Sequence, residues 1–213
     1  MRIVLTLAAS LSLATATSAL AVTAPAIDFS LGLGGATLED SFPEIDNSAN
    51  TRFNFTYSFA PFEAEERFRL GFGVSLEGSG ETGRRVEDES DSRISERPYS
   101  RLFAFTPEVR FAWSQPLGER WFIEPNVAIA LPIANYSVGE IETYRRYNEY
   151  YFVDDDQTRV GIGVRPGLMV GYWLAPRHAI GLDLTYLYSS IDFRGVGPEY
   201  EAFSVGVFYR LAF

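Results

Sequence analysis

The side chains of this sequence that could do chemistry are mainly carboxylates and guanidinium groups. The chain has 28 aspartate and glutamate residues against 18 basic residues, with one histidine and no cysteine. A Ser–His nucleophile pair needs an imidazole base within reach, and His178 is the single candidate. Carboxylate pairs exist, but nothing in the sequence marks a cleft around them. We therefore predict that the protein is not an enzyme and uses no cofactor.

Nine charged residues are predicted to point inward from strands whose other face is apolar. They are Asp28, Arg52, Arg69, Glu108, Arg110, Glu124, Arg165, Asp183 and Arg210. Charges buried in a narrow interior must be paired, because an unpaired ion there is costly. Such pairs could form a gate or a proton path, or they could fill a core. We favour the filled core, because the interior of an eight-stranded barrel is just wide enough for side chains.

Asp154, Asp155 and Asp156 form an acidic triplet. Hard cations such as Ca²⁺ and Mg²⁺ prefer carboxylate oxygens, so the triplet could hold a cation that bridges to phosphate groups. It lacks the glycine and the ligand spacing of a dedicated calcium loop. We favour a solvated acidic loop over a metal site.

Eight runs of alternating apolar residues must position these side chains. They cover residues 27–33, 53–59, 68–76, 103–113, 121–133, 160–172, 180–188 and 203–213. Alternation with period two indicates strands with one apolar face, and no charged residue falls on any of these faces. The opposite faces are rich in Gly, Ala, Ser and Thr, which suits a narrow barrel lumen, whereas a soluble barrel would be densely polar there.

The connections between these runs alternate strictly between long and short. The long ones cover residues 36–50, 77–100, 134–157 and 189–200, and the short ones cover 60–67, 114–120 and 173–178. Barrels of the bacterial outer membrane have long extracellular loops, short periplasmic turns and an even number of strands. The pattern therefore predicts a membrane barrel with both termini in the periplasm.

Two groups of residues refine this prediction. Aromatic residues gather next to the short turns or the C-terminus and predict a periplasmic girdle: Tyr57, Phe59, Trp113, Trp121, Tyr172, Trp173, Tyr209 and Phe213. Three prolines lie inside strands, where they cannot donate to the ladder, and predict local bulges: Pro107, Pro125 and Pro166.

The last run is the sharpest motif of the chain. Its apolar face holds Phe203, Val205, Val207, Tyr209, Leu211 and Phe213. A strand with an apolar face at a free C-terminus would promote aggregation of a soluble domain. In a bilayer the same strand can close a barrel. This end resembles the C-terminal assembly signal of OmpA/OmpX-like outer-membrane β-barrel proteins of Gram-negative bacteria.

The resemblance carries further implications for partners and for chemistry. It implies that the barrel-assembly machinery is a partner and that lumenal ion pairs plug the barrel. Similar barrels that act on lipid A use a catalytic serine with a histidine near the outer leaflet, whereas His178 falls at a predicted periplasmic turn. The resemblance thus supports the prediction that the protein is not an enzyme.

Hairpin geometry predicts which lumenal charges meet. Folding the fourth and fifth runs about residues 117–118 places Arg110 opposite Glu124. Folding the sixth and seventh about residues 174–175 places Arg165 beside Asp183. Closure of the last strand on the first brings Arg210 near Asp28.

The N-terminus predicts export. A basic start, an apolar run over residues 3–13 and the sequence Ala19-Leu20-Ala21 indicate a signal peptide, residues 1–21. Residues 22–213 are then one all-β domain, an eight-stranded antiparallel up-and-down transmembrane barrel in the cell outer membrane. Mean hydropathy is −0.03 and no other long apolar run exists, which excludes helical spans. The net charge of −10 disfavours nucleic acid as a partner.

Three functions remain open from the sequence. The first is a structural or surface-interaction protein that contacts outer-membrane lipid, lipopolysaccharide and a surface partner through residues 77–100 and 134–157. The second is a pore for small solutes. The third is a soluble periplasmic ligand-binding barrel of lipocalin type.

Overall fold

The structure is a computed structural model, and it describes residues 24–39, 45–62, 67–82, 86–88, 93–144, 149–193 and 199–213. The predicted signal peptide, residues 1–21, lies outside the described residues. The strands are β1 (Ala26–Leu38), β2 (Ile45–Phe59), β3 (Phe68–Thr82), β4 (Val86–Asp88), β5 (Arg93–Trp113), β6 (Gln115–Leu117), β7 (Trp121–Ala130), β8 (Ile133–Tyr144), β9 (Glu149–Val160), β10 (Ile162–Ala175), β11 (His178–Ser190) and β12 (Glu199–Ala212). In the part of the chain that the structure describes, no helix is long and apolar enough to cross a membrane.

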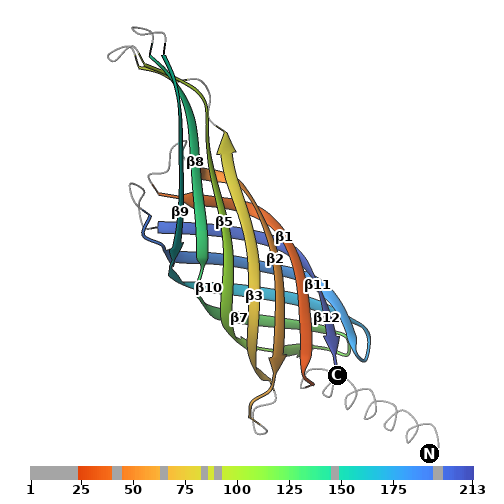
Figure 1. Ribbon diagram of the computed structural model, residues 1–213. Coiled ribbons are helices and arrows are strands. Elements are labelled where there is room, and N and C mark those ends of the chain that lie inside the picture. The colour runs from red at the N-terminus through yellow and green to blue at the C-terminus, as the bar shows by residue number, and fades with distance from the viewer. Residues whose placement is uncertain are drawn as a thin grey trace, which may run out of the picture.

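The strands close into a ring. The order β7–β10–β11–β12–β1–β2–β3–β5 is antiparallel throughout, and β5 pairs again with β7 over Glu108–Ala112. The N-terminal strand closes on the C-terminal one, with Ala26 opposite Ala212. The chain is an eight-stranded antiparallel β-barrel (Figure 1). The predicted fold class is confirmed.

The barrel wall is continuous where two pairs of strands meet end to end. β8 follows β7 after residues 131–132, and β10 follows β9 after Gly161. The Gly161 N–H donates to the carbonyl of Pro132 at 2.8 Å, so the ladder runs on across both interruptions. β7 with β8, and β9 with β10, are therefore the two arms of one long hairpin.

Side chains alternate between a packed interior and an exposed apolar wall. On β12 the inward residues are buried, while the outward Phe203, Val205, Val207 and Tyr209 are between 38% and 61% exposed. The outward residues of the other barrel strands repeat this pattern, with Leu33 at 67% and Val160 at 68%. An apolar surface that surrounds the molecule is what a lipid bilayer demands of a barrel.

Two sequence-based details are wrong. No register shift occurs at Pro107, Pro125 or Pro166, although the β10–β11 ladder skips Arg165 and Pro166 and the β5–β7 ladder ends at Asn126, because a missing donor interrupts pairing without needing an extra residue. Trp173 does not join the girdle: it points inward, is 6% exposed and packs on Phe122, with ring centroids 5.5 Å apart.

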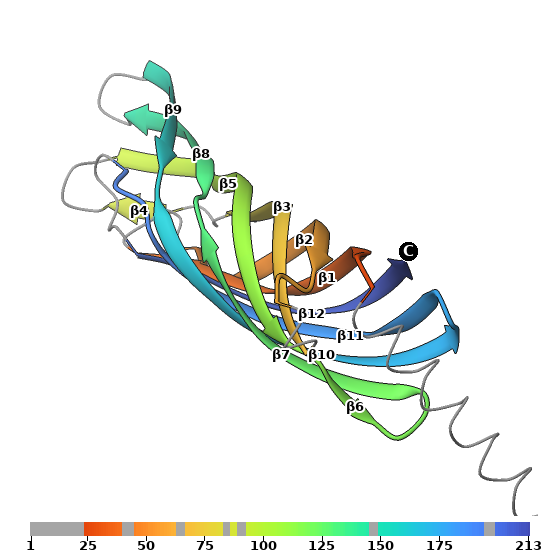
Figure 2. The same cartoon turned by 90° about the horizontal axis from the view of Figure 1, so that it is seen from below.

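Two of the predicted loops are strands for most of their length. β3 continues to Thr82, β5 already begins at Arg93, and β8 and β9 cover most of residues 134–157. β4, β8, β9 and residues 93–98 of β5 form a projecting sheet that rises beyond the other strands (Figure 1). Figure 2 shows the C-terminus at the opposite end of the barrel from β4, β8 and β9.

Candidate functional site

Among the described residues, ten charged side chains are buried in the lumen. The carboxylates are Asp28, Glu77, Glu108, Glu124 and Asp183, and the guanidinium groups are Arg52, Arg69, Arg110, Arg165 and Arg210. Each of the ten residues is at most 4% exposed. Five acids face five arginines, so the formal charge of the lumen cancels. A balanced lumen is the condition under which buried charges can be tolerated.

Arg210 organises the cluster nearer the termini. Its Nε and Nη2 donate to the two carboxylate oxygens of Asp28 at 2.6 and 2.8 Å. Its Nη1 and Nη2 donate to the two oxygens of Glu124 at 2.9 and 2.8 Å. The guanidinium carbon also lies 5.1 Å from the ring centroid of Phe122 and 5.9 Å from that of Phe208. Two bidentate pairs and two cation–π contacts therefore fix one side chain in place.

A pair of glycines makes room for these rings. In the ladder, Gly171 faces Gly181, and each glycine also faces one ring, Phe122 or Phe208. A Cβ on Gly171 would stand 2.2 Å from the Phe122 ring, and a Cβ on Gly181 would stand 2.6 Å from the Phe208 ring. Two glycines thus lie between two aromatic rings, and the four residues fill the narrow lumen without a steric clash.

Arg52 begins a second cluster farther along the lumen. Its Nη1 donates to Asp183 Oδ2 at 3.0 Å, although the two residues stand 131 positions apart in the chain. Its Nε lies 3.6 Å from Glu77 Oε1. The contact joins β2 to β11 across the interior.

Glu108 is the centre of this second cluster. Arg110 Nη2 donates to Glu108 Oε1 at 3.1 Å, and Arg165 Nη1 lies 3.1 Å from Glu108 Oε2. Asn54 Nδ2 donates to the same carboxylate at 3.0 Å. Arg165 also contacts Glu77 directly. One carboxylate therefore holds two guanidinium groups that come from β5 and β10.

The predicted pair Arg110–Glu124 is wrong. The β5–β7 register places Ala128 opposite Arg110. The turn lies at residues 118–120, later than we predicted, and Gly118 takes a φ of 83° there, a conformation that glycine adopts readily. The later turn moves Glu124 along the wall, where it meets Arg210.

The predicted pair Arg165–Asp183 is also wrong. Met169 stands opposite Asp183, because β10 continues to Ala175 and the turn is formed by residues 176–177. The shift carries Asp183 to Arg52 and Arg165 to Glu77 and Glu108.

The structure brings Arg210 and Asp28 together as the sequence predicts, because they are opposite in the β1–β12 ladder. Arg69 donates to Ser58 Oγ at 2.9 Å and to the Ala24 carbonyl at 3.1 Å.

Sequence reasoning missed Glu77, which we assigned to a loop although it continues the alternation of β3 by one residue. That continued alternation was the signal that could have found it.

Two apolar layers lie beside and among the ion pairs. Toward the projecting sheet lie large side chains that include Leu38, Leu102, Tyr136, Leu187 and Tyr200. Toward the termini lie Phe122, Met169, Trp173 and Phe208 with four alanines. Phe122, Met169, Leu187 and Phe208 are buried, as the filled lumen requires. Ion pairs and apolar side chains together therefore fill the lumen.

The acidic triplet lies in β9 and not in a loop. Asp154, Asp155 and Asp156 stand opposite Gly139, Val138 and Ser137 in the ladder. The Asp156 side chain is exposed, and the side chains of Asp154 and Asp155 lie outside the described part. Within the described residues no group of carboxylates and histidines is arranged to hold a metal ion.

The predicted assembly signal lies on the outer wall of β12, which pairs with β1 and β11 along its whole length. Phe203, Val205, Val207, Tyr209 and Phe213 are exposed, and Leu211 is half-buried. The Phe213 N–H donates to the carbonyl of Pro25 at 2.9 Å, so the last residue is still part of the ladder. Recognition of this strand by assembly machinery stays a prediction.

We expect that deleting Phe213 blocks assembly in cells, because the deletion removes the terminal aromatic residue of the predicted signal and its ladder bond. The measurement is the amount of folded protein in an outer-membrane fraction. Deletion of Phe62, an exposed aromatic residue in a short turn, is the matched control and should leave assembly intact. Normal levels of the Phe213 deletion would refute the assignment.

Comparisons with known proteins find only distant structural likeness. No family model and no curated protein matches the chain. Among solved structures, Ail of Yersinia pestis in complex with sucrose octasulfate is 15% identical, with 89% of this chain and 100% of that chain covered and a TM-score of 0.45. Neisserial surface protein A is 13% identical, with 89% and 97% covered and a TM-score of 0.48. A major outer membrane protein from Thermus thermophilus is 15% identical, with 88% and 100% covered and a TM-score of 0.39.

At such identities and scores the likeness concerns the fold alone. The eight-stranded barrel that the resemblance to OmpA/OmpX-like proteins implied is confirmed.

Proposed function

We propose that the protein is an integral outer-membrane barrel that presents its projecting sheet to a partner outside the cell. The observation that carries this proposal is the combination of an apolar outer wall with a filled lumen. A wall that exposes Leu33, Val160 and Val207 by more than 60% would not stay dispersed in water. A lumen packed with ion pairs and buried apolar side chains supports a scaffold in preference to a channel.

The pore hypothesis is disfavoured by the same packing. A conducting path would have to pass both apolar layers and the ion clusters around Arg210 and Glu108. We expect planar-bilayer recordings of the purified protein to show only small and rare openings. A steady, large conductance that survives removal of the projecting sheet would make the protein a pore.

The projecting sheet offers a specific binding surface, which is the open edge of β9. Among the described residues, β9 pairs with β8 and with no other strand. Because Gly161 donates to Pro132, just before β8, and antiparallel hydrogen bonds alternate along a strand, the N–H groups of Phe152, Asp154 and Asp156 point away from β8. An exposed row of donors and acceptors can accept an extended segment of another protein as an added strand.

Proline substitution tests this edge. Phe152→Pro with Asp154→Pro should remove two outward donors and leave the β8 ladder intact. We expect cells that display the wild type to adhere to immobilised extracellular-matrix or serum proteins. Cells that display the double variant should adhere about tenfold less.

Two controls keep this result interpretable. Folded barrel is quantified by its faster migration before boiling on an SDS gel. Thr158→Pro, at the base of the same edge, removes an outward donor next to the barrel and should have a smaller effect. Equal adhesion of wild type, double variant and cells without the protein would refute the proposed role.

A further inference from the structure

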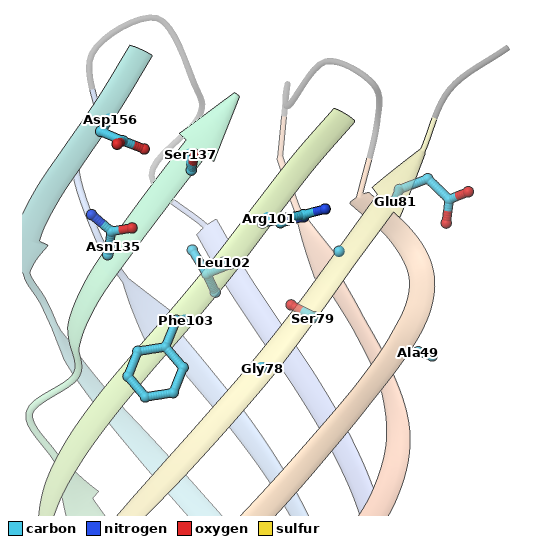
Figure 3. A pocket seen from close by; sticks show the side chains of 11 residues that line it. Ala49, Gly78, Ser79, Glu81, Arg101, Leu102, Phe103, Asn135, Ser137 and Asp156 are labelled. Carbon is cyan, nitrogen blue, oxygen red and sulfur yellow. The ribbon is translucent and has the colours of Figure 1, made fainter. Parts of the chain in front are cut away.

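A cavity of about 600 Å³ lies on the outer wall where β2, β3, β5, β8 and β9 run side by side (Figure 3). Gly78 and Gly80 of β3 line it on one side, and Arg101 of β5 projects next to them. Asn135 and Ser137 of β8 continue the lining. The cavity is open to the outside of the barrel, and Asp156 borders it on the side of β9.

The cavity lies at the upper border of the apolar wall. On β5 the outward residues from Trp113 to Phe103 are apolar, and Arg101 is the next outward residue. Ten residues at ~3.3 Å each, tilted by ~45°, rise ~23 Å along the membrane normal, which matches an apolar band of ~25 Å. Arg101 therefore lies at the level of the lipid headgroups in the leaflet farther from the termini.

The outward face of β3 changes character at the same level. Its lower part presents five large apolar residues between Phe68 and Leu76, and the next two outward positions are Gly78 and Gly80. A side chain on Gly78 would meet nothing within 4 Å. Glycine inside a strand weakens the strand and commonly marks close approach of a ligand. The two glycines therefore create the hollow that larger residues would fill.

The lining combines a cation with hydrogen-bonding groups and two carboxylates. Arg101 stacks over the Tyr99 ring at 4.9 Å and makes no ion pair with any described residue. Ser137 stands beside Arg101 in the ladder, and Asp156 stands beside Ser137. Figure 3 shows Asp156 at one end of this row and Glu81 at the other. A guanidinium group recognises phosphate, and carboxylates flanking it accept hydrogen bonds from sugar hydroxyls.

We propose that this cavity binds the phosphorylated sugar headgroup of a glycolipid in the surrounding leaflet. Arg101 takes the phosphate, Ser137 and Asp156 take sugar hydroxyls, and the acyl chains lie on the apolar wall below, beside Phe103. The cavity goes beyond the proposed function, because the lipid would contact side chains of the outer wall, whereas the surface partner would pair with backbone groups of β9; Asp156 is shared by the two. It also gives the protein a preferred lipid neighbour, which the apolar wall alone does not.

Native mass spectrometry of the protein folded in detergent tests the site with three probes. They are lipid A (an acylated, phosphorylated glucosamine disaccharide), the same lipid without phosphates, and inorganic phosphate. The wild type should retain a single lipid A and hold the dephosphorylated lipid about tenfold more weakly. Inorganic phosphate at millimolar concentration should not displace lipid A, because the chains contribute to binding.

Two variants separate the site from general lipid adhesion. Arg101→Gln should lower lipid A occupancy about tenfold, and Gly78→Ile should do the same with Arg101 still present, by filling the hollow. Gly78→Ile should fold at least as well as the wild type, since isoleucine favours strands and meets open space there. Arg177→Gln, which removes the same charge at an exposed turn of the opposite end, should bind as the wild type does.

Several results would overturn the proposal. Wild-type occupancy in Arg101→Gln or Gly78→Ile would show that the lipid lies elsewhere. Equal binding of the dephosphorylated lipid would remove the role of Arg101. Displacement by inorganic phosphate would mean a site for free anions. The β9 proline variants should retain lipid A, so failure of the surface-binding role leaves this result unchanged.

Discussion

Replacing Arg210 with alanine should destabilise the folded barrel by about 3–5 kcal/mol, the cost of breaking a buried ion pair by removing one partner. The substitution leaves Asp28 and Glu124 without the four hydrogen bonds that Arg210 donates. It also empties the space over the Phe122 and Phe208 rings. Urea unfolding in lipid vesicles measures the loss as a change in midpoint at constant slope.

Removing the stranded charges should recover most of this stability. The triple variant Arg210→Met, Asp28→Asn and Glu124→Gln keeps the volume of the cluster but none of its charge, and replacing a buried ion cluster as a whole costs far less than breaking it. Arg177→Ala, at an exposed turn, should change stability by no more than about 0.5 kcal/mol. If Arg210→Ala costs no more than Arg177→Ala, the lumen is not dry and the ion pairs do not hold the barrel together.

Alternation in the sequence was enough to predict the fold and the face of the residues in the eight runs, although Trp173, just beyond the sixth run, was assigned to the wrong face. On β2, Phe53, Phe55 and Tyr57 point outward and Arg52 points inward, as predicted. The signal is strong because lipid excludes charge from one face and a narrow lumen excludes bulk from the other. Both constraints act on every residue of the membrane-spanning part.

Strand ends could not be predicted in the same way. Above the membrane neither face meets lipid, so the large apolar residues of β3 end at Leu76, and beyond Glu77 the sequence gives no sign that the strand continues to Thr82. For the same reason we predicted residues 134–157 as a loop, although β8 and β9 cover most of these residues. Backbone pairing extends the hairpin beyond the region that hydrophobicity marks.

The strand register was the second feature that the sequence could not predict, and the register determines which ion pairs form. Alternation fixes which face a residue occupies but not which residue stands opposite, and moving a turn by one or two residues changes every partner along the hairpin. Arg210 and Asp28 were predictable because the two ends of the chain pair from their termini inward. Contacts across the lumen, such as Arg52 with Asp183, depend on the packing of non-adjacent strands and leave no local signal.

Replacing Val207 with arginine should destabilise the barrel by ~2–4 kcal/mol in a bilayer, because the cation is forced to the midplane of the apolar wall. Val207 lies halfway along the outward face of β12 between Phe203 and Phe213, and it is 61% exposed. Urea unfolding in lipid vesicles measures the cost. The control is the same valine-to-arginine substitution at a second position of the wall.

That control is Val160→Arg, at the upper border of the wall, where Val160 is 68% exposed and an arginine reaches the headgroups at a cost of ~0–1 kcal/mol. Both valines are exposed to a similar degree, so their difference reports depth in the membrane and not packing. In a soluble barrel, both positions would face water and both changes would stay within about 0.5 kcal/mol. Equal, small effects at the two sites would therefore mean that the apolar wall does not face lipid, and would remove the membrane from the proposed function.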